Sequence, residues 1–238
     1  MRLLDPETVI KDFPILHVGR TEEEKELIKV ARVRIFQPRE RLWTAGDPVP
    51  GPTFLLSGLV RMYYEGDDSE QATVTCLWPN DVPATSLQEN GEWSCQAVAV
   101  APSICITLPS RPFFQSCGRT PQMALTALTA LANTFYNRMR WEALLRLVSL
   151  KPRLMMIFAR MADELGTPTP EGILLDFPLT HEIVAGLGCV QRDQAGRTLN
   201  ELAEEGFIVD RPRYRWLVPD RARLGPQPII ELLPPIAV

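Results

Sequence analysis

Charged and polar side chains between residues 191 and 205 have the chemistry needed to read DNA bases. Arg192 and Arg197 each carry a planar guanidinium group that can donate two hydrogen bonds to the O6 and N7 atoms of guanine. Asp193 can accept a hydrogen bond from the amino group of cytosine. Bonds to phosphate oxygens, by contrast, position a protein on the duplex without reading its sequence. The side chains expected to bond to phosphate are Gln191, Gln194 and Thr198.

These residues share one face if the segment forms a helix. At about 100° per residue, Arg192, Asp193 and Arg197 project to one polar arc. Gly196 lies in the same arc and would let backbone and bases approach closely. The alternative interpretation is an ordinary solvated helix face with an arginine–aspartate pair. The other arc is small and apolar and would pack on a preceding helix, through Ala195, Leu199, Leu202 and Ala203.

The residues in front of this helix predict a helix-turn-helix. Thr180 is a suitable N-cap for a first helix over 181–187 and is also a candidate DNA contact. Gly188 and Cys189 follow as the turn, and Gly206 ends the second helix. A polar helix after such a turn is the arrangement that enters the major groove of DNA.

Two short β-type runs then flank the turn RPRYR at 211–215, which predicts a wing. Arginines at 211, 213 and 215 would give it a positive edge suited to phosphate, and Arg213 is the expected contact. A plain basic hairpin is the alternative, so the wing depends on the helix before it.

The first half of the chain has a different residue pattern. Between residues 31 and 109, short β-type runs alternate with turn segments, which predicts an antiparallel sandwich or barrel. A short helix over 21–30 precedes them, with Thr21 and Glu24 in capping-box positions.

Residues 121–148 predict a single helix of roughly 28 residues, about 42 Å long. A long amphipathic helix after a β domain often forms a dimer seam. The alternative is a helix that packs on the core of its own domain. A further helix is expected over 151–165, ended by Gly166. The apolar stripe of the long helix consists of Leu128, Leu131, Phe135 and Met139.

The bulk composition fits a soluble α+β protein of two domains. The 238 residues are 45% hydrophobic and 23% charged, as in globular proteins. No apolar run approaches the ~20 residues that span a bilayer, and the N-terminus does not resemble a signal peptide. We therefore expect a cytoplasmic protein with no membrane partner. The predicted parts are a sensor over 1–118, a dimerisation helix over 119–149 and a DNA-binding domain over 150–238.

Charge and cysteine content restrict the function further. The net charge of −4 is unusual for a compact nucleic-acid binder, although an acidic sensor domain can mask a local basic surface. The five cysteines form no CxxC pair and only two histidines are present, so we expect no metal and no cofactor. Neither a phosphate-binding loop nor a nucleophile elbow is present, and an enzyme is not expected.

Four motifs of this chain resemble the family of the cyclic-AMP receptor protein and the fumarate–nitrate reductase regulator (CRP/FNR). RDQAGR at 192–197 resembles the recognition-helix pattern Arg-Glu-x-x-x-Arg, and LTHE at 179–182 resembles the entry to the first helix. FLLSGLVRMYY at 54–64 resembles the glycine-turned strand pair, and LPSRPFF at 108–114 the exit into the long helix. The resemblance implies a homodimer on a near-palindromic site, with Arg192, Asp193 and Arg197 as base readers. It also implies contact with RNA polymerase.

The chain departs from this family in the sensor pocket. Cyclic-AMP binders of the family carry Gly-Glu for the ribose and an arginine for the cyclic phosphate. Here Pro83 and Ala84 stand where Gly-Glu would be, and Trp93 stands where the arginine would be. A buried anion without its charge partner costs several kcal/mol, and we expect no binding of cyclic AMP. The candidate pocket residues are Pro83, Ala84, Leu87, Trp93 and Ser94.

The effector is unknown, and three states of the sensor remain open. Trp93, Leu87 and their neighbours could fill the pocket themselves, a small uncharged molecule could bind, or Cys76, Cys95 or Cys105 could sense redox state. No cysteine lies within residues 1–75, which argues against the iron–sulfur subgroup. His17 is a haem-ligand candidate by residue type alone.

Two functions therefore remain after the sequence alone. The first is a transcription regulator whose partners are double-stranded DNA, a second copy of the chain and RNA polymerase. The second is a β-roll ligand-binding or scaffolding module whose helix-turn-helix does not read DNA. The Pro-rich C-terminal tail could dock on the protein or serve as an interaction peptide.

Overall fold

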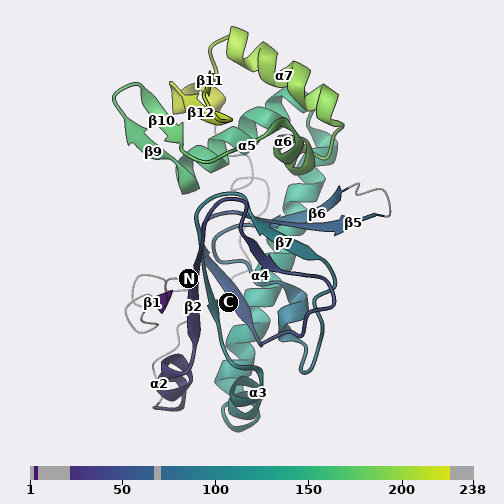
Figure 1. Ribbon diagram of the computed structural model, residues 1–238, viewed down its shortest axis with the longest axis vertical. Helices are drawn as coiled ribbons and strands as arrows, with labels where there is room; N and C mark the ends of the chain where they lie inside the picture. The colour runs from purple at the N-terminus through teal and green to yellow at the C-terminus, as the bar shows by residue number, and fades with distance from the viewer. Residues whose placement is uncertain (1–2, 5–21, 67–70, 226–238) are drawn as a thin grey trace. The chain divides into compact units, whose positions relative to one another are not determined.

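The computed structural model describes residues 3–4, 22–66 and 71–225 (Figure 1). The chain divides into two compact units, Met1–Phe135 and Tyr136–Val238. Helix α4 (Pro121–Leu147) belongs to both units. His17, Thr21 and the tail over 226–238 lie outside the described residues. No helix in the described segments has the length and apolarity needed to cross a membrane.

The first unit contains two antiparallel sheets of four strands each, which confirms the predicted β-roll. Sheet neighbours such as β2 and β8 are distant in sequence, as the crossovers of a roll require. One sheet has the order β1 (Leu3–Leu4), β2 (Arg32–Phe36), β8 (Ser103–Thr107), β4 (Thr53–Ser57). The other has the order β3 (Arg41–Trp43), β7 (Gln96–Ala99), β5 (Val60–Glu65), β6 (Gln71–Leu77).

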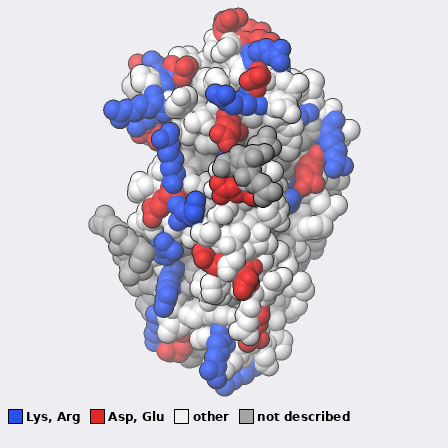
Figure 2. All heavy atoms as spheres, turned by 45° about the vertical axis from the view of Figure 1, so that its right-hand side comes forward, with Lys and Arg blue, Asp and Glu red and all other residues white. Residues whose placement is uncertain are grey.

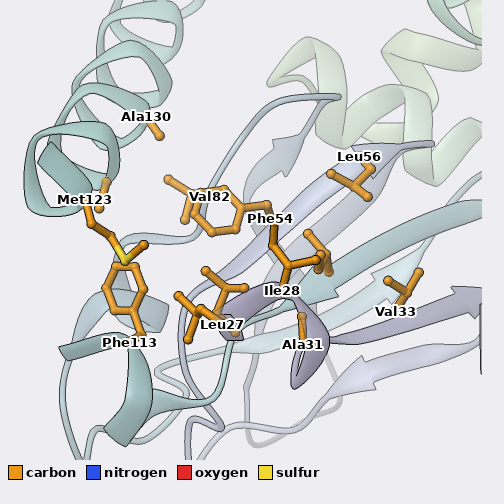
Figure 3. Close-up of a cluster of buried hydrophobic side chains, with 13 residues drawn as sticks. Leu27, Ile28, Ala31, Val33, Phe54, Leu56, Val82, Phe113, Met123 and Ala130 are labelled. Atoms are coloured by element: carbon orange, nitrogen blue, oxygen red, sulfur yellow. The ribbon is translucent and has the colours of Figure 1, made fainter. Parts of the chain in front are cut away.

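Strand β4 is buried on both faces and separates two apolar clusters. Phe54 and Leu56 contribute to one cluster, and Leu55, which points the opposite way, contributes to the other. Helices α2 (Glu22–Lys29), α3 (Ser110–Arg119) and α4 cover the first cluster. Figure 3 shows Met123 of α4 against the ring of Phe113 of α3.

A glycine permits the tight connection from β4 to β5. Gly58 has a φ of +99°, and a Cβ atom there would lie 2.3 Å from the Ser103 hydroxyl. The Ser103 hydroxyl accepts a hydrogen bond from the Leu59 amide at 3.2 Å. The predicted glycine-turned strand pair therefore has a steric cause as well as a conformational one.

The second unit is the predicted winged helix-turn-helix. Helix α5 (Leu150–Leu165) is followed by strands β9 (Thr167–Thr169) and β10 (Gly172–Leu175), helices α6 (His181–Gly188) and α7 (Arg192–Glu204), and strands β11 (Val209–Arg211) and β12 (Arg215–Val218). The sheet is antiparallel with the order β11-β12-β10-β9. The segment expected as a loop after Gly166 is in fact the β9–β10 hairpin.

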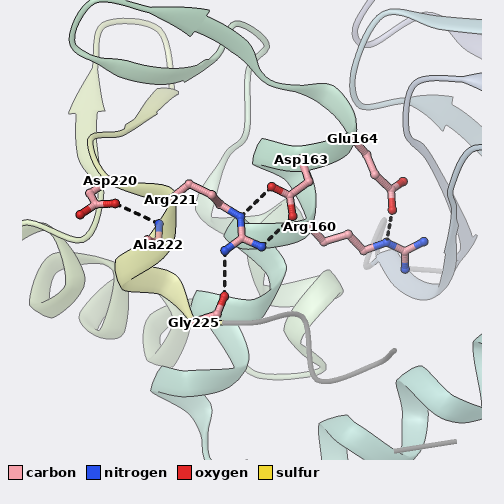
Figure 4. Close-up of polar contacts among 7 residues, drawn as sticks. All are labelled: Arg160, Asp163, Glu164, Asp220, Arg221, Ala222 and Gly225. Atoms are coloured by element: carbon pink, nitrogen blue, oxygen red, sulfur yellow. Dashed lines mark hydrogen bonds and ion pairs between the residues drawn. The ribbon is translucent and has the colours of Figure 1, made fainter. Parts of the chain in front are cut away.

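A bidentate ion pair fastens the start of the last described element to α5 (Figure 4). Arg221, in the short 3-10 helix η2 (Arg221–Leu224), donates to the two carboxylate oxygens of Asp163 at 2.7 and 2.6 Å. Its remaining nitrogen donates to the Gly225 carbonyl at 2.8 Å. Helix α5 is thus held at its C-terminal end by the segment that follows the wing.

Candidate nucleic-acid interface

Helix α6 begins where the sequence predicts. The Thr180 hydroxyl accepts a hydrogen bond from the Ile183 amide at 3.3 Å, which is the N-cap interaction. Cys189 ends the helix in the left-handed conformation, with a φ of 51°. Helix α6 therefore has an N-cap at its start and an αL residue at its end, where the turn to α7 begins.

Helix α7 separates its polar and apolar residues as predicted. Arg192, Asp193 and Arg197 are all exposed, whereas Ala195 and Leu199 are fully buried. The Arg197 Nε donates to the Asp193 carbonyl at 3.3 Å, one turn earlier on the same face. The three side chains predicted to read bases are therefore presented to solvent on a helix whose other face is fixed by packing. Gln191 and Gln194 are exposed beside them.

One expectation about α7 is wrong, and Gly196 has a role in addition to the expected one. Thr198 is only 7% exposed, because it projects toward the apolar arc, and its hydroxyl cannot serve as a phosphate contact. Gly196 does not simply keep the face low. A Cβ atom at this position would lie 3.2 Å from Nδ1 of His181, so the glycine lets α7 pack closely against the start of α6.

The wing is less basic than its sequence suggests. Arg211 pairs with Glu171, and Arg215 pairs with Asp176 at 2.9 Å, so two of the three arginines have carboxylate partners. Arg213 is exposed at the tip and, in the part of the chain that the structure describes, carries no carboxylate partner. Basic and acidic groups are interspersed on the face drawn in Figure 2. Only the wing tip keeps the predicted free positive charge.

Helix α4 has two apolar faces on opposite sides. Met123, Ala127 and Ala130 are buried in the cluster of the first unit. Leu128, Phe135 and Met139 are 61%, 63% and 54% exposed. With Leu125, which is 53% exposed, these residues fall within an arc of about 80° at 100° per residue. Leu131 differs from the other predicted seam residues, because it packs partly against the first-unit cluster.

The interior of the β-roll contains two stacked tryptophans. Trp93, 4% exposed, stacks on Trp43 with ring centroids 4.0 Å apart and planes inclined by 12°. Both belong to the second apolar cluster, together with Met62 and Cys105. The predicted pocket residues do not meet there: Leu87 packs on the first cluster, Pro83 is buried, and Ala84 and Ser94 are exposed.

The segment around the predicted pocket is hydrogen-bonded to other parts of the protein. The Val82 amide donates to the Thr134 hydroxyl of α4 at 3.1 Å. In the short 3-10 helix η1 (Ala84–Leu87), the Ser86 hydroxyl donates to the Pro83 carbonyl at 2.7 Å and accepts from the Thr53 amide at 3.2 Å. Trp43, Thr134 and Ser86 were not singled out from the sequence, because their partners lie on elements far away in the chain.

Burial makes the interior thiols unreactive. Desolvation raises the pKa of Cys105 to about 12, although the nearby charge of Arg34 acts in the opposite direction. Desolvation also raises the pKa of Cys95, against a smaller effect of a hydrogen bond with Ser94. A thiol must ionise to react with oxidants, so the redox interpretation loses support at these two residues.

Two family models match this chain. Residues 33–120 match the cyclic nucleotide-binding domain, and residues 152–226 match the Crp-like helix-turn-helix domain. The global nitrogen regulator of Synechocystis sp. is 26% identical over 205 residues, which cover 85% of this chain and 90% of that protein. The global nitrogen regulator of Nostoc sp. is 25% identical over 179 residues, covering 74% and 80%.

Solved structures agree with these matches at the level of the fold. A CRP-family transcriptional regulator from Thermus thermophilus aligns with a TM-score of 0.68 and 22% identity, covering 80% of this chain and 94% of the other. A second regulator of the CRP/FNR family from the same organism aligns with a TM-score of 0.60 and 19% identity, covering 81% and 95%. Because a cyclic nucleotide-binding domain is followed by a Crp-like helix-turn-helix domain, this chain belongs to the CRP/FNR family of transcription regulators.

Proposed function

We propose that the protein is a sequence-specific DNA-binding regulator that acts as a homodimer on a near-palindromic operator and does not depend on cyclic AMP. The observation that carries this proposal is the exposed face of α7. Arg192, Asp193 and Arg197 project together from a helix anchored by its buried face. That is the arrangement by which helix-turn-helix proteins read the major groove.

The exposed face of α4 supports the dimer. Leu128, Phe135 and Met139 offer large apolar surface on the side of the helix that the first-unit core does not cover. Regulators of this family act as dimers, and the spacings of three, seven and four residues from Leu125 through these residues are those of a coiled-coil seam. A second copy of the chain would cover this face along its own α4.

The stacked tryptophans support independence from cyclic AMP. Trp93 and Trp43 are stacked inside the apolar cluster, so Trp93 offers no charge to a cyclic phosphate. Calorimetry with cyclic AMP should give no heat of binding. Saturable binding at micromolar concentrations would contradict this part of the proposal. Contact with RNA polymerase remains part of the proposal without assigned residues.

Selection of bound duplexes from a random pool, at one fixed salt concentration, tests DNA reading directly. The wild-type protein should recover related half-sites arranged as a near-palindrome. Arg197→Ala should weaken binding to the recovered duplex by about 1–3 kcal/mol and relax the preference at one base position. Arg160→Ala is a matched control, because Arg160 pairs with Glu164 on α5 (Figure 4).

The outcomes separate the two candidate functions. If Arg197→Ala leaves affinity and preference unchanged, base reading by that residue is wrong. If the wild-type protein recovers no duplex, the second function stands, namely a β-roll ligand-binding or scaffolding module whose helix-turn-helix does not read DNA.

A further inference from the structure

Arg153, near the start of α5, is bonded to the ends of two other helices. Its Nε and one terminal nitrogen donate to the Val148 carbonyl, just after the end of α4, at 3.2 and 2.8 Å. Its other terminal nitrogen donates to the carbonyl of Gly188, the last residue of α6, at 2.8 Å. One side chain thus joins the end of the long helix to the turn of the helix-turn-helix.

The chemistry of helix ends explains why an arginine stands here. The last carbonyls of a helix have no partner within the helix, and they carry the negative end of its dipole. A guanidinium is always charged, and its planar fork can serve several acceptors at once. Arg153 meets these needs at two C-termini together. A lysine would keep the charge but would replace the fork with a single nitrogen.

Packing beside this contact fixes the turn on α5. A Cβ atom at Gly188 would lie 3.1 Å from Cδ2 of Leu154 and 3.9 Å from Cδ1 of Ile157. Gly188 itself is buried. Leu154 is the residue next to Arg153, so the apolar contact and the hydrogen bond act on the same end of α6. The turn that sets the direction of α7 is therefore held at one place by both contacts.

We propose that Arg153 is a positioning residue for operator recognition, which fixes the direction of α7 relative to the end of α4. This inference rests on the proposed function. A dimer that reads two half-sites about 34–36 Å apart needs both recognition helices in a fixed relation to the dimer helices. Loosening that relation should impair recognition of half-site spacing more than recognition of one half-site.

The test compares Arg153→Gln and Arg153→Lys with the control Arg111→Gln, at an exposed arginine of α3 in the first unit. Three duplexes are used: the selected palindrome, a single half-site, and the palindrome with one base pair inserted at its centre. Arg153→Gln should lose about tenfold in affinity for the palindrome, as expected for lost charge-assisted hydrogen bonds. Its affinity for the half-site should stay within about twofold, a difference of roughly 0.4 kcal/mol.

Spacing discrimination distinguishes positioning from general destabilisation. A variant that merely folds less well would lose affinity for all three duplexes in equal proportion. Arg153→Lys should resemble Arg153→Gln, because the charge alone cannot reproduce the fork. Wild-type spacing discrimination in Arg153→Lys, or equal losses on all three duplexes, would overturn the proposal.

A measurement without DNA separates this inference from the proposed function. In Arg153→Gln, amide hydrogen exchange should accelerate at Val190, whose amide donates to the Ala185 carbonyl at 3.0 Å. Exchange at Val33 in the roll should not change. If exchange at the turn is unaltered, the contact does not hold the turn and the inference fails, whether or not the wild-type protein selects a duplex. Faster exchange with retained spacing discrimination would also overturn it.

Discussion

Trp93 lies in the roll interior with its ring nearly parallel to that of Trp43. The family resemblance predicts an arginine for the cyclic phosphate at this position. In this chain the side chain makes an apolar contact inside the protein. The stability of the roll should therefore depend on this side chain rather than on a ligand.

Trp93→Ala should lower the free energy of unfolding by about 3–5 kcal/mol, because a large buried ring is lost and a cavity remains. Denaturation in urea measures the change. Glu92→Ala, at an exposed neighbouring position, should change stability by no more than about 0.5 kcal/mol. Equal stability of wild type and Trp93→Ala would mean that the ring does not support the interior.

The cysteines should react in the order of their burial. Cys189 is exposed, whereas Cys95 and Cys105 are buried and their thiols have raised pKa values. Iodoacetamide at neutral pH should therefore modify Cys189 first and leave Cys105 intact until the protein unfolds. Peptide mass spectrometry identifies the modified sites. Early modification of Cys105 would contradict its burial.

The Cys105 thiol makes the free energy of unfolding depend on pH in the alkaline range. The pKa of Cys105 is about 12 in the folded protein, above its ordinary value of 9.0. Folding favours the neutral thiol. Its contribution to the free energy of unfolding is therefore fully present below pH 9 and is lost as the pH rises through about 12. Cys105→Ala should show a weaker loss of stability over that alkaline range.

Residue types and spacing predict the polar face of α7 well, because helical periodicity alone determines which side chains share an arc. Contacts between elements that are distant in sequence are not predicted in this way. Neither the Trp43–Trp93 stack nor the three bonds of Arg153 follow from local pattern. They depend on how strands and helices pack after they have formed.

At the scale of elements, the arginines in the two strands of the wing pair with carboxylates, and the arginine at its tip does not. Arg211 forms an ion pair with Glu171, and Arg215 forms one with Asp176. Of the three arginines of the hairpin, Arg213 is the one predicted to contact phosphate. Strand β9 escaped prediction because Pro168 lies within it. Proline lacks the amide donor and is tolerated at a sheet edge, which is where β9 lies. Strand β3 has only three residues, too few for a period to be recognised.

Arg213→Ala should weaken binding to all duplexes nearly uniformly and reduce the slope of log affinity against log salt by about one. Titrations at several salt concentrations measure that slope. Arg211→Ala is the matched control on the same hairpin, and it should change the slope less because Arg211 is already paired with Glu171. A larger effect of Arg211→Ala would assign the phosphate contact to the wrong arginine.

For the whole molecule, α4 is the decisive element because one of its apolar faces packs on the first unit and the other is exposed. Ala127 and Ala130 face the core of the first unit, whereas Leu128 and Phe135 face solvent. The sequence predicts one apolar stripe and leaves two explanations for it, a seam or a core contact. Both faces exist, and small alanines on the core side made the second face hard to recognise.

Phe135→Asp should convert a dimer to a monomer, because an unpaired charge would enter the apolar seam. Sedimentation velocity measures the state of assembly, and affinity for the palindrome should fall with it. Val30→Asp is the control, since Val30 is an exposed apolar residue on the surface after α2. A monomeric wild type, or a dimeric Phe135→Asp, would contradict the α4 seam.

The stacked indoles of Trp43 and Trp93 also have an optical consequence. Indole rings with centroids 4.0 Å apart couple electronically, and coupled rings whose transition dipoles are twisted relative to each other give a paired positive and negative band in circular dichroism. Trp216, which packs edge-on against Phe158 in the second unit, has no parallel indole partner among the described residues. The paired band therefore reports on the roll alone, and melting of the sensor can be followed separately from melting of the DNA-binding unit.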